Sequence, residues 1–451
     1  MSRFPEAFQE ETRKRLGNDF GLFMESLNGA APVSIRQNPA KNALPLPGKP
    51  VPWSAFGRYL ETRPSFTLDP RLHGGAYYVQ EASSMFIEQA FRQLTDLHAP
   101  LNVLDLCAAP GGKSTHILSL LSDQSLLVSN EVIRSRASVL AENLQKWGYQ
   151  NSVVTNSDPD HFQSLPGFFD VMVIDAPCSG EGLFRKDHEA AEEWSPQHVA
   201  LCASRQKRIV ADAWPALKED GILIYCTCTY NEQENEDNLL WLREQHDVEF
   251  LKVSIDGWNI QETKKNDVIG YRFFPHRVEG EGFFMSVIRK KQVSPSLRLK
   301  ANRDLTPAPA KIVNTLQSWI HHPERVSFFQ WKDLLYFFPE AHTLHLGMLH
   351  QHLKVVNAGI ATATVKHDKL IPEHALAMST DLRRENFKTL SVGHDEAIRY
   401  LRRDPLTLPE TDKGYHLIVF EDVALGWVNS LGNRFNNMYP VEWRIRMQKT
   451  S

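Results

Sequence analysis

One segment of the sequence joins an acid and a thiol in a loop bounded by glycines. Residues 170–182, DVMVIDAPCSGEG, run from an apolar stretch into Asp175 and then into Cys178. A continuous apolar run bounded by turn residues is typical of a buried parallel strand, and ligands bind at the carboxyl ends of such strands. Pro177 fixes the local backbone, so both side chains are expected to be held in place. For an isolated pair, the alternative is a turn acid beside a small buried cysteine.

A second thiol follows another apolar run. Residues 225–236, YCTCTYNEQENE, place Cys228 at a strand end, near the loop of Cys178. A Cys-x-Cys sequence can be half of a zinc site, but no second ligand pair with the usual spacing is present, so we predict no metal. Two thiols and a carboxylate on neighbouring strand ends suit covalent catalysis. One reaction of this kind is thiolate addition to carbon 6 of cytosine, which allows carbon 5 to accept a methyl group from a sulfonium donor.

Small residues and acids at earlier strand ends predict a crevice for a nucleoside. Residues 103–115, VLDLCAAPGGKST, form a tight loop and then open a helix, expected at Ser114 or Thr115. The spacing is neither GxGxxG nor that of a P-loop. Glu131 ends the next strand, where a carboxylate can accept hydrogen bonds from a ribose, and Asp158 follows the third, where it can meet an adenine amino group. Each acid alone is more often an exposed turn residue, but together they suit a nucleoside without a phosphate.

The elements that position these residues alternate between short apolar runs and amphipathic helices. Seven such runs begin at residues 101, 126, 152, 170, 221, 248 and 282. The alternation predicts βαβ units and a doubly wound, mostly parallel α/β sheet, and the last two runs lack a long helix between them, so one of them is open to antiparallel pairing. We expect an N-terminal domain or extension (1–70), a catalytic domain (71–291), a linker (292–310), a small α+β module (311–378) and a C-terminal module (379–451).

Composition limits the class of protein. The chain has 451 residues, 42% hydrophobic and 23% charged residues, no membrane-length apolar run and no signal-peptide pattern at its start. Five cysteines, an odd number, favour reduced thiols and a cytoplasmic location. The net charge of −4 means that any RNA contact has to be local, as in the basic tail from Arg383 to Arg446. Arg185 and Lys186 are candidates for phosphate contacts, with surface charge as the equal alternative.

Several long motifs resemble one family. VLDLCAAPGGK, IDAPCSGEG, YCTCTYNEQENE and PHRVEGEGFF, together with the strand end at Glu131, are similar to the bacterial ribosomal RNA (cytosine-5) methyltransferases of the Sun/nucleolar-protein family. YVQEASSM at residue 78 and GWVNSLGNRFNNMYPVEWR at residue 426 resemble its F-type 16S ribosomal RNA subgroup. The resemblance implies a class I S-adenosylmethionine-dependent methyltransferase of seven strands, the last antiparallel, with a small N-terminal domain and a PUA-like RNA-binding module.

The resemblance also implies roles for individual residues. It makes Cys228 the nucleophile, gives Cys178 a part in product release, and has Asp175 bond the cytosine edge. Cys226 stands where the family usually has serine, and Cys178 is the second candidate for the nucleophile. The S-adenosylmethionine-binding residues that it implies are Cys107, Ala108, Ala109, Pro110, Gly111, Gly112, Lys113, Glu131, Asp158 and Asp175.

The implied partner is RNA, either 16S ribosomal RNA or the small ribosomal subunit. Transfer RNA is the alternative substrate, and we expect no DNA, no membrane and a monomer. A non-catalytic RNA-binding assembly factor is the main alternative from another class, but it has no need of both thiols. A Rossmann oxidoreductase is a weaker alternative, because the glycine fingerprint is absent.

Overall fold

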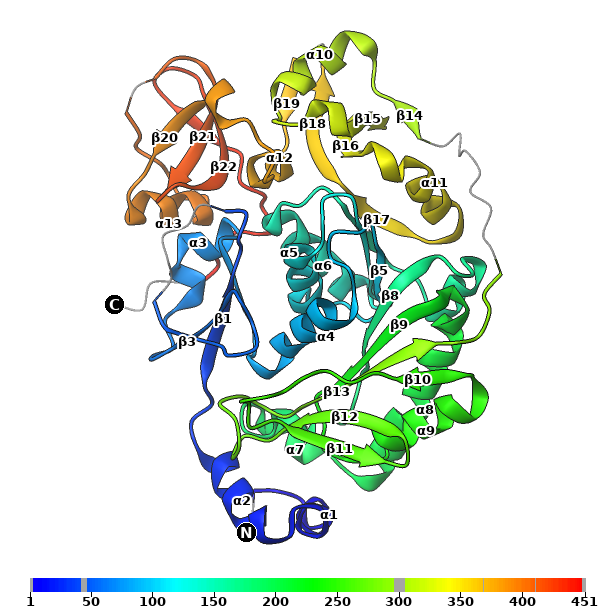
Figure 1. Cartoon of the computed structure of the whole chain (residues 1–451). Helices are drawn as coiled ribbons and strands as arrows, with labels where there is room; N and C mark the ends of the chain where they lie inside the picture. The colour runs from blue at the N-terminus through cyan, green and yellow to red at the C-terminus, as the bar shows by residue number, and fades with distance from the viewer. Residues whose placement is uncertain (1–2, 42–46, 296–304, 368, 410, 448–451) are drawn as a thin grey trace.

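A mixed sheet of ten strands forms the centre of the described chain (Figure 1). The structure is a computed structural model that describes residues 3–41, 47–295, 305–367, 369–409 and 411–447. Five parallel strands make the middle of the sheet. In spatial order they are β7 (Ser152–Thr155), β6 (Leu126–Asn130), β5 (Asn102–Asp105), β8 (Phe169–Asp175) and β9 (Leu217–Thr227). The predicted doubly wound α/β architecture is confirmed.

Antiparallel strands extend this sheet at both edges. They are β13 (Phe283–Lys290) beside β9, then β12 (Val268–Phe273) and β11 (Gln261–Lys265), with β10 (Val248–Phe250) also on β13 and β17 (Val355–Ala358) on β7. All seven predicted runs are strands. The sequence analysis predicted neither β11 nor β12. Strand β11 reads QETKK and carries no apolar residue, whereas β12 reads VIGYRF and does carry an apolar signal. Strand β17 was expected within the C-terminal part of the chain.

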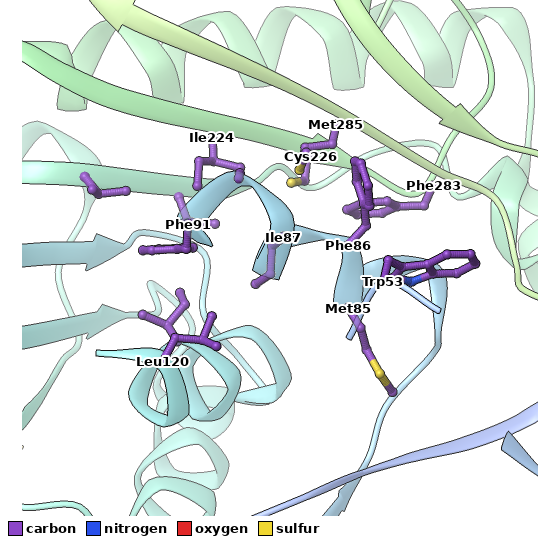
Figure 2. Packing of buried hydrophobic residues seen from close by; sticks show 14 of the residues in the cluster. Trp53, Met85, Phe86, Ile87, Phe91, Leu120, Ile224, Cys226, Phe283 and Met285 are labelled. Atoms are coloured by element: carbon purple, nitrogen blue, oxygen red, sulfur yellow. The ribbon is translucent and has the colours of Figure 1, made fainter. Parts of the chain in front are cut away.

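Helices cover both faces of the sheet, and each strand alternates its side chains between the two layers. On β9, Ile222, Ile224 and Cys226 enter one core, whereas Leu223 and Tyr225 enter the other. The first core, part of which is drawn in Figure 2, lies under α4 (Ile87–Leu94), α5 (Gly112–Leu120) and α6 (Arg134–Trp147). The second core lies under α8 (Pro196–Ala213) and α9 (Glu236–Gln245), and the short α7 (His188–Glu193) precedes α8.

The N-terminal part contains two helices and an antiparallel sheet. The two helices are α1 (Glu6–Leu16) and α2 (Phe20–Asn28). The sheet, in spatial order, consists of β2 (Lys49–Pro50), β3 (Gly57–Leu60), β1 (Val33–Gln37) and β4 (Tyr77–Val79). Pro50 lies in the edge strand, where a missing N–H donor is tolerated.

The C-terminal part contains two further sheets. The first consists of β14 (Thr306–Pro307), β15 (Val326–Trp331), β16 (Leu334–Pro339), β18 (Ile360–Lys366) and β19 (Lys369–Pro372), with α10 (Ala310–Ser318), α11 (Thr343–His352) and α12 (His374–Met378). The second consists of β20 (Lys388–Ser391), β21 (Gly414–Phe420), β22 (Val423–Ser430) and β23 (Phe435–Asn437), with α13 (His394–Arg402).

The two ends of the chain pack against each other. Val423 of β22 shares a buried cluster with Ile35 and Tyr77 of the N-terminal sheet, which lies beside the C-terminal sheet in Figure 1. The domain boundaries at residues 70, 291, 310 and 378 stay predictions. Among the described residues, none of the helices is long and apolar enough to span a bilayer.

Candidate active site

The loop between β5 and α5 is built for close approach of a ligand to its backbone. Gly111 has φ +113°, a conformation that favours glycine, and α5 begins directly after it at Gly112. The helix therefore starts two or three residues before the predicted Ser114 or Thr115. The Ala108 N–H donates to the Asn130 carbonyl at 2.8 Å, and the Arg136 guanidinium donates to the Ala109 carbonyl at 2.8 Å. These bonds hold the loop over the end of β6. Burial raises the pKa of the Cys107 thiol, which stays protonated.

Asp105 is a buried acid that the sequence analysis did not single out. Its side chain is fully buried at the end of β5, and its Oδ2 accepts a hydrogen bond from the Ser114 hydroxyl at 2.6 Å. Its Oδ1 is buried without a hydrogen-bond partner in the described part of the chain. Burial raises the pKa of Asp105 to about 7, against the opposing hydrogen bond of Ser114 and charge of Lys113. An acid at the end of an apolar run was the available signal, as at Glu131.

Glu131 and Asp158 lie at the next two strand ends, as the sequence predicted. The Glu131 carboxylate is buried, and it accepts a hydrogen bond from the Ile133 N–H at 2.9 Å and lies 3.5 Å from the Arg136 guanidinium. Asp158 is more exposed, and its carboxylate lies 3.3 Å from the guanidinium of Arg208 on α8. Glu131 is thus fixed beside the loop, and Asp158 is tied to the helix on the far side.

Lys113 links the glycine loop to the second candidate segment. Its ammonium donates to the Asp175 carboxylate at 2.8 Å and lies 5.4 Å from the centre of the Phe283 ring. Burial disfavours the charge on Lys113, but the attraction of Asp175 outweighs it and raises the pKa of the lysine. Asp175 is about one third exposed, so it can still receive a ligand.

Cys178 and Cys228 lie together at the carboxyl edge. Their Sγ atoms are 3.1 Å apart, and the Cys228 N–H also donates to the Cys178 sulfur at 3.3 Å. Both thiols are partly exposed and neither is in a disulfide. The hydrogen bond with Cys228, followed by burial, raises the pKa of Cys178, so that Cys178 is the protonated partner of the pair.

Cys226 points away from this pair. Its side chain is fully buried and belongs to the apolar core under α4, where Figure 2 shows it close to Met285 and Phe283. Burial raises the pKa of Cys226, and an inaccessible protonated thiol is a poor nucleophile. The third thiol of the motif is therefore a packing residue.

The buried carboxylates of Glu234 and Glu181 join the two cysteine loops. The sequence analysis gave neither residue a role. The Glu234 carboxylate accepts hydrogen bonds from the Ser179 N–H at 2.9 Å, Gln206 at 2.9 Å and Asn231 at 2.6 Å. The Glu181 carboxylate accepts from the Tyr230 N–H at 2.9 Å. Both acids are almost fully buried, and burial raises the pKa of Glu234. The residues that follow Cys178 and Cys228 are thereby fixed to each other.

Close backbone contact also explains the glycines of these motifs. A Cβ at Gly182 would lie 2.5 Å from the Gly282 carbonyl oxygen and 2.8 Å from that of Cys228. The Gly182 N–H donates to the same Cys228 carbonyl at 2.9 Å. Only glycine allows the loop after β8 to lie this close to the chain that enters β13.

Arg185 is neither a surface charge nor an available phosphate ligand. Its side chain is 7% exposed, lies 3.0 Å from the Glu281 carboxylate and donates to the Gly280 carbonyl at 2.7 Å. Lys186 is more exposed and lies 3.6 Å from the same carboxylate. The proposed phosphate role of Arg185 is therefore wrong, because the Glu281 carboxylate already neutralises it.

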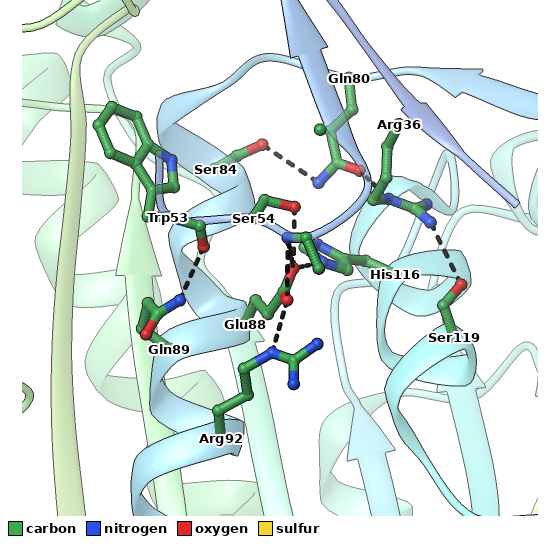
Figure 3. A network of polar contacts seen from close by, with 12 residues as sticks. Arg36, Trp53, Ser54, Gln80, Ser84, Glu88, Gln89, Arg92, His116 and Ser119 are labelled. Atoms are coloured by element: carbon green, nitrogen blue, oxygen red, sulfur yellow. Dashed lines mark hydrogen bonds and ion pairs between the residues drawn. The ribbon is translucent and has the colours of Figure 1, made fainter. Parts of the chain in front are cut away.

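The N-terminal sheet holds α5 from behind (Figure 3). The fully buried Arg36 of β1 donates to the Gly112 carbonyl at 3.2 Å, to the Thr115 hydroxyl at 2.6 Å and to Gln80 at 2.8 Å. Its guanidinium also stacks over Trp147 at 4.5 Å. Burial lowers the pKa of Arg36 to about 9. The position of the glycine loop therefore depends on the N-terminal part of the chain.

Comparisons with known proteins agree over almost the whole chain. Three family profiles match: 16S rRNA methyltransferase RsmB/F over residues 94–289, the N-terminal domain of 16S rRNA methyltransferase RsmF over 4–82, and the methyltransferase RsmF PUA domain over 387–445. Ribosomal RNA small subunit methyltransferase F from Shigella boydii serotype 4 is 30% identical over 475 residues, covering 97% of this chain and 96% of the relative. The protein of that name from Cronobacter sakazakii is 30% identical over 478 residues, with the same coverage.

Solved structures share the fold. A methyltransferase homolog protein from Pyrococcus horikoshii has a TM-score of 0.52 and 26% identity, covering 63% of this chain and all of that chain. NSun6 from Pyrococcus horikoshii with SFG, an analogue of S-adenosylmethionine, has a TM-score of 0.53 and 19% identity, covering 64% of this chain and 99% of that chain.

The mixed sheet with its parallel centre, the matched family and the solved methyltransferase homolog define an S-adenosylmethionine-dependent methyltransferase. Within that class, the chain belongs to the ribosomal RNA small subunit methyltransferase F family. The residues fit the cofactor: the buried Asp105 oxygen without a partner suits a cationic ligand, and the fixed carboxylate of Glu131 suits a ribose.

Proposed function

We propose that the chain methylates carbon 5 of a cytosine in 16S ribosomal RNA through a covalent bond between Cys228 and the base. The observation that carries the proposal is the pair of partly exposed thiols, with their Sγ atoms 3.1 Å apart, beside the strand end that bears Asp175. The names of the relatives support 16S ribosomal RNA as the substrate.

Cys228 begins the reaction as a thiolate. It attacks carbon 6 of a cytosine turned out of its stack, and the carbon 5–carbon 6 electron pair moves toward carbon 5. Asp175 bonds the polar edge of the base and offsets the charge that develops on the ring. S-adenosylmethionine supplies the electrophilic methyl group that carbon 5 accepts.

Cys178 acts in the second half of the reaction. A base next to its thiol removes the proton from carbon 5, the electrons restore the ring double bond, and the bond from carbon 6 to Cys228 breaks. Because Cys178 carries its proton and touches Cys228, it can return a hydrogen bond to the departing thiolate.

The residues proposed to bind S-adenosylmethionine share the carboxyl edge of the sheet. Hydrogen bonds hold the glycine loop from two sides, at Ala108 and at Ala109, and Lys113 keeps Asp175 in place. The proposed set is Cys107, Ala108, Ala109, Pro110, Gly111, Gly112, Lys113, Glu131, Asp158 and Asp175. We add Asp105 to it.

The proposal also covers the location, the oligomeric state and the domain division of the protein. The protein acts in the cytoplasm as a monomer, and the domain division given above describes its folding units. Reduced thiols fit this location, since all five cysteines are free.

The test is methyl transfer from labelled S-adenosylmethionine to purified 16S ribosomal RNA, assembled small subunits and transfer RNA, followed by mapping of 5-methylcytosine. The proposal expects label on carbon 5 of cytosine in one of the first two substrates, and none with Cys228→Ala. If label appears only in transfer RNA, the proposed 16S ribosomal RNA substrate is wrong. If label appears on an atom other than carbon 5 of cytosine, the proposed reaction is wrong.

A further inference from the structure

A polar cavity whose lining includes neither thiol lies where three parts of the chain meet. Its volume is about 220 Å³, several times the roughly 30 Å³ that one water occupies in the liquid. Its lining includes Lys41 from the N-terminal part, His321 from the small module region, and Thr380 and Arg384, which precede β20. The methyl-transfer site uses none of these residues.

Lys41 has donor capacity left over after its structural bonds. Its ammonium donates to the carbonyls of Gly74 and Lys146, each at 2.7 Å, which holds the C-terminal end of α6. An ammonium has three N–H donors, so one is left over among the residues that the structure describes. Burial and then the positive charge of Arg384 lower the pKa of Lys41 to about 7. The two cations are therefore close enough to repel each other.

The Arg384 guanidinium likewise has N–H donors left over within the described ranges. Its guanidinium donates to the Asp422 carbonyl at 2.6 Å, and a guanidinium has five N–H donors. Burial lowers the pKa of Arg384, although the Asp422 carboxylate opposes the shift. Glu385 also lines the cavity, but its carboxylate is 63% exposed and lies 3.9 Å from Arg383. In the described ranges, neither Lys41 nor Arg384 is within ion-pair distance of a carboxylate.

Two half-buried cations beside one polar cavity, which have no carboxylate partner among the described residues, fit an anion with several acceptor oxygens. We propose that the cavity binds a phosphate group between Lys41 and Arg384, and that this phosphate belongs to the backbone of the RNA substrate. The source of the phosphate rests on the proposed function, since an RNA held here would contact the N-terminal and C-terminal parts at once. The cavity would position RNA that the thiols then modify.

The variant that tests the proposal is Arg384→Gln, with Arg383→Gln as its matched control. Arg383 carries the same charge one residue earlier, is also half-buried, and donates to the His321 carbonyl at 3.2 Å. Binding of 16S ribosomal RNA is measured over a series of salt concentrations. We expect Arg384→Gln to weaken binding about 3- to 10-fold and to reduce the slope of log affinity against log salt by about 0.7–0.9, the value for one phosphate contact. The control is expected to leave both unchanged, and kcat at saturating RNA is expected to be equal in all three proteins.

A second arm uses inorganic phosphate and no RNA. We expect phosphate to raise the Tm of the wild type and of Arg383→Gln more than that of Arg384→Gln. Equal weakening of RNA binding by both variants would overturn the site in favour of general charge. If phosphate raises Tm only when Arg384 is present, but RNA affinity is unchanged in Arg384→Gln, the phosphate does not come from RNA. If neither Tm nor RNA affinity differs between Arg384→Gln and the wild type, the cavity does not bind phosphate. If the wild type methylates no RNA, the proposed function fails, but the phosphate arm still tests the cavity.

Discussion

The Sγ atoms of Cys178 and Cys228 lie 3.1 Å apart, although 50 residues separate the two cysteines in the sequence. Parallel strands β8 and β9 bring their ends together, and the buried carboxylates of Glu181 and Glu234 lock the two loops to each other. The pair is thus a property of the fold. The proposed function assigns the attack to one thiol of this pair and the release step to the other.

Removal of the buried third thiol tests whether Cys226 takes part. Because Cys226 lies in the apolar core, Cys226→Ala is expected to lower the free energy of unfolding by about 1 kcal/mol, as for one buried methyl-sized group. Methyl transfer is expected to stay within about twofold of the wild type. Urea unfolding and single-turnover transfer measure the two quantities. Loss of transfer in a folded variant would show that Cys226 reacts.

The buried Glu234 carboxylate, called the loop clamp below, holds the two cysteine loops together. Its removal is expected to impair catalysis without weakening cofactor binding. Glu234→Ala removes the acceptor of the Ser179 N–H and one acceptor each from Gln206 and Asn231, which keep hydrogen bonds to Pro177 and Glu181; the loss costs on the order of 3 kcal/mol in stability. We expect kcat to fall at least tenfold, while the Kd for S-adenosylmethionine stays the same, because the glycine loop is held by other bonds.

Glu232→Ala in the same loop is the control for this clamp. Its carboxylate is 49% exposed and pairs with the exposed Lys265, so the change is expected to cost less than about 1 kcal/mol and to spare kcat. Equal effects of the two substitutions would contradict the clamp.

The buried Asp105 is expected to make the free energy of unfolding depend on pH. Burial raises the pKa of Asp105 from 3.8 to about 7, so between these values the folded protein keeps a proton that the unfolded chain releases. Asp105 therefore destabilises the fold increasingly as pH rises from about 4 to 7, and not further above that. From pH 5 to pH 7, the wild type is expected to lose roughly 2–3 kcal/mol relative to Asp105→Asn. Urea unfolding of both proteins at the two pH values checks this; a constant difference would contradict it.

The sequence was sufficient for the central sheet because continuous apolar runs such as residues 170–175 record burial on both faces. It was also sufficient to place Glu131, Asp175, Cys178 and Cys228 at one edge, since parallel strands share their carboxyl ends. Strands with polar sequences such as QETKK in β11 have no such signal.

Tertiary contacts explain what sequence reasoning missed. Arg185 was open to a phosphate role because nothing local shows that Glu281, 96 residues away, pairs with it. The partner of strand β17 is β7, which is about 200 residues earlier in the chain, so its place in the central sheet has no local signature. Glu234 lay within a charged run, and only the folded chain shows that this acid is buried.

The central claim, that Cys228 attacks the base and Cys178 assists its release, is tested most directly by trapping the bond between protein and RNA. Cys178→Ala is incubated with S-adenosylmethionine and 16S ribosomal RNA, and the mixture is separated on a denaturing gel beside the wild type, Cys228→Ala and Cys178→Ala/Cys228→Ala. The account predicts a persistent protein–RNA adduct in Cys178→Ala alone, and no methyl transfer by Cys228→Ala. An adduct that survives in the double variant, or methyl transfer by Cys228→Ala, would contradict it.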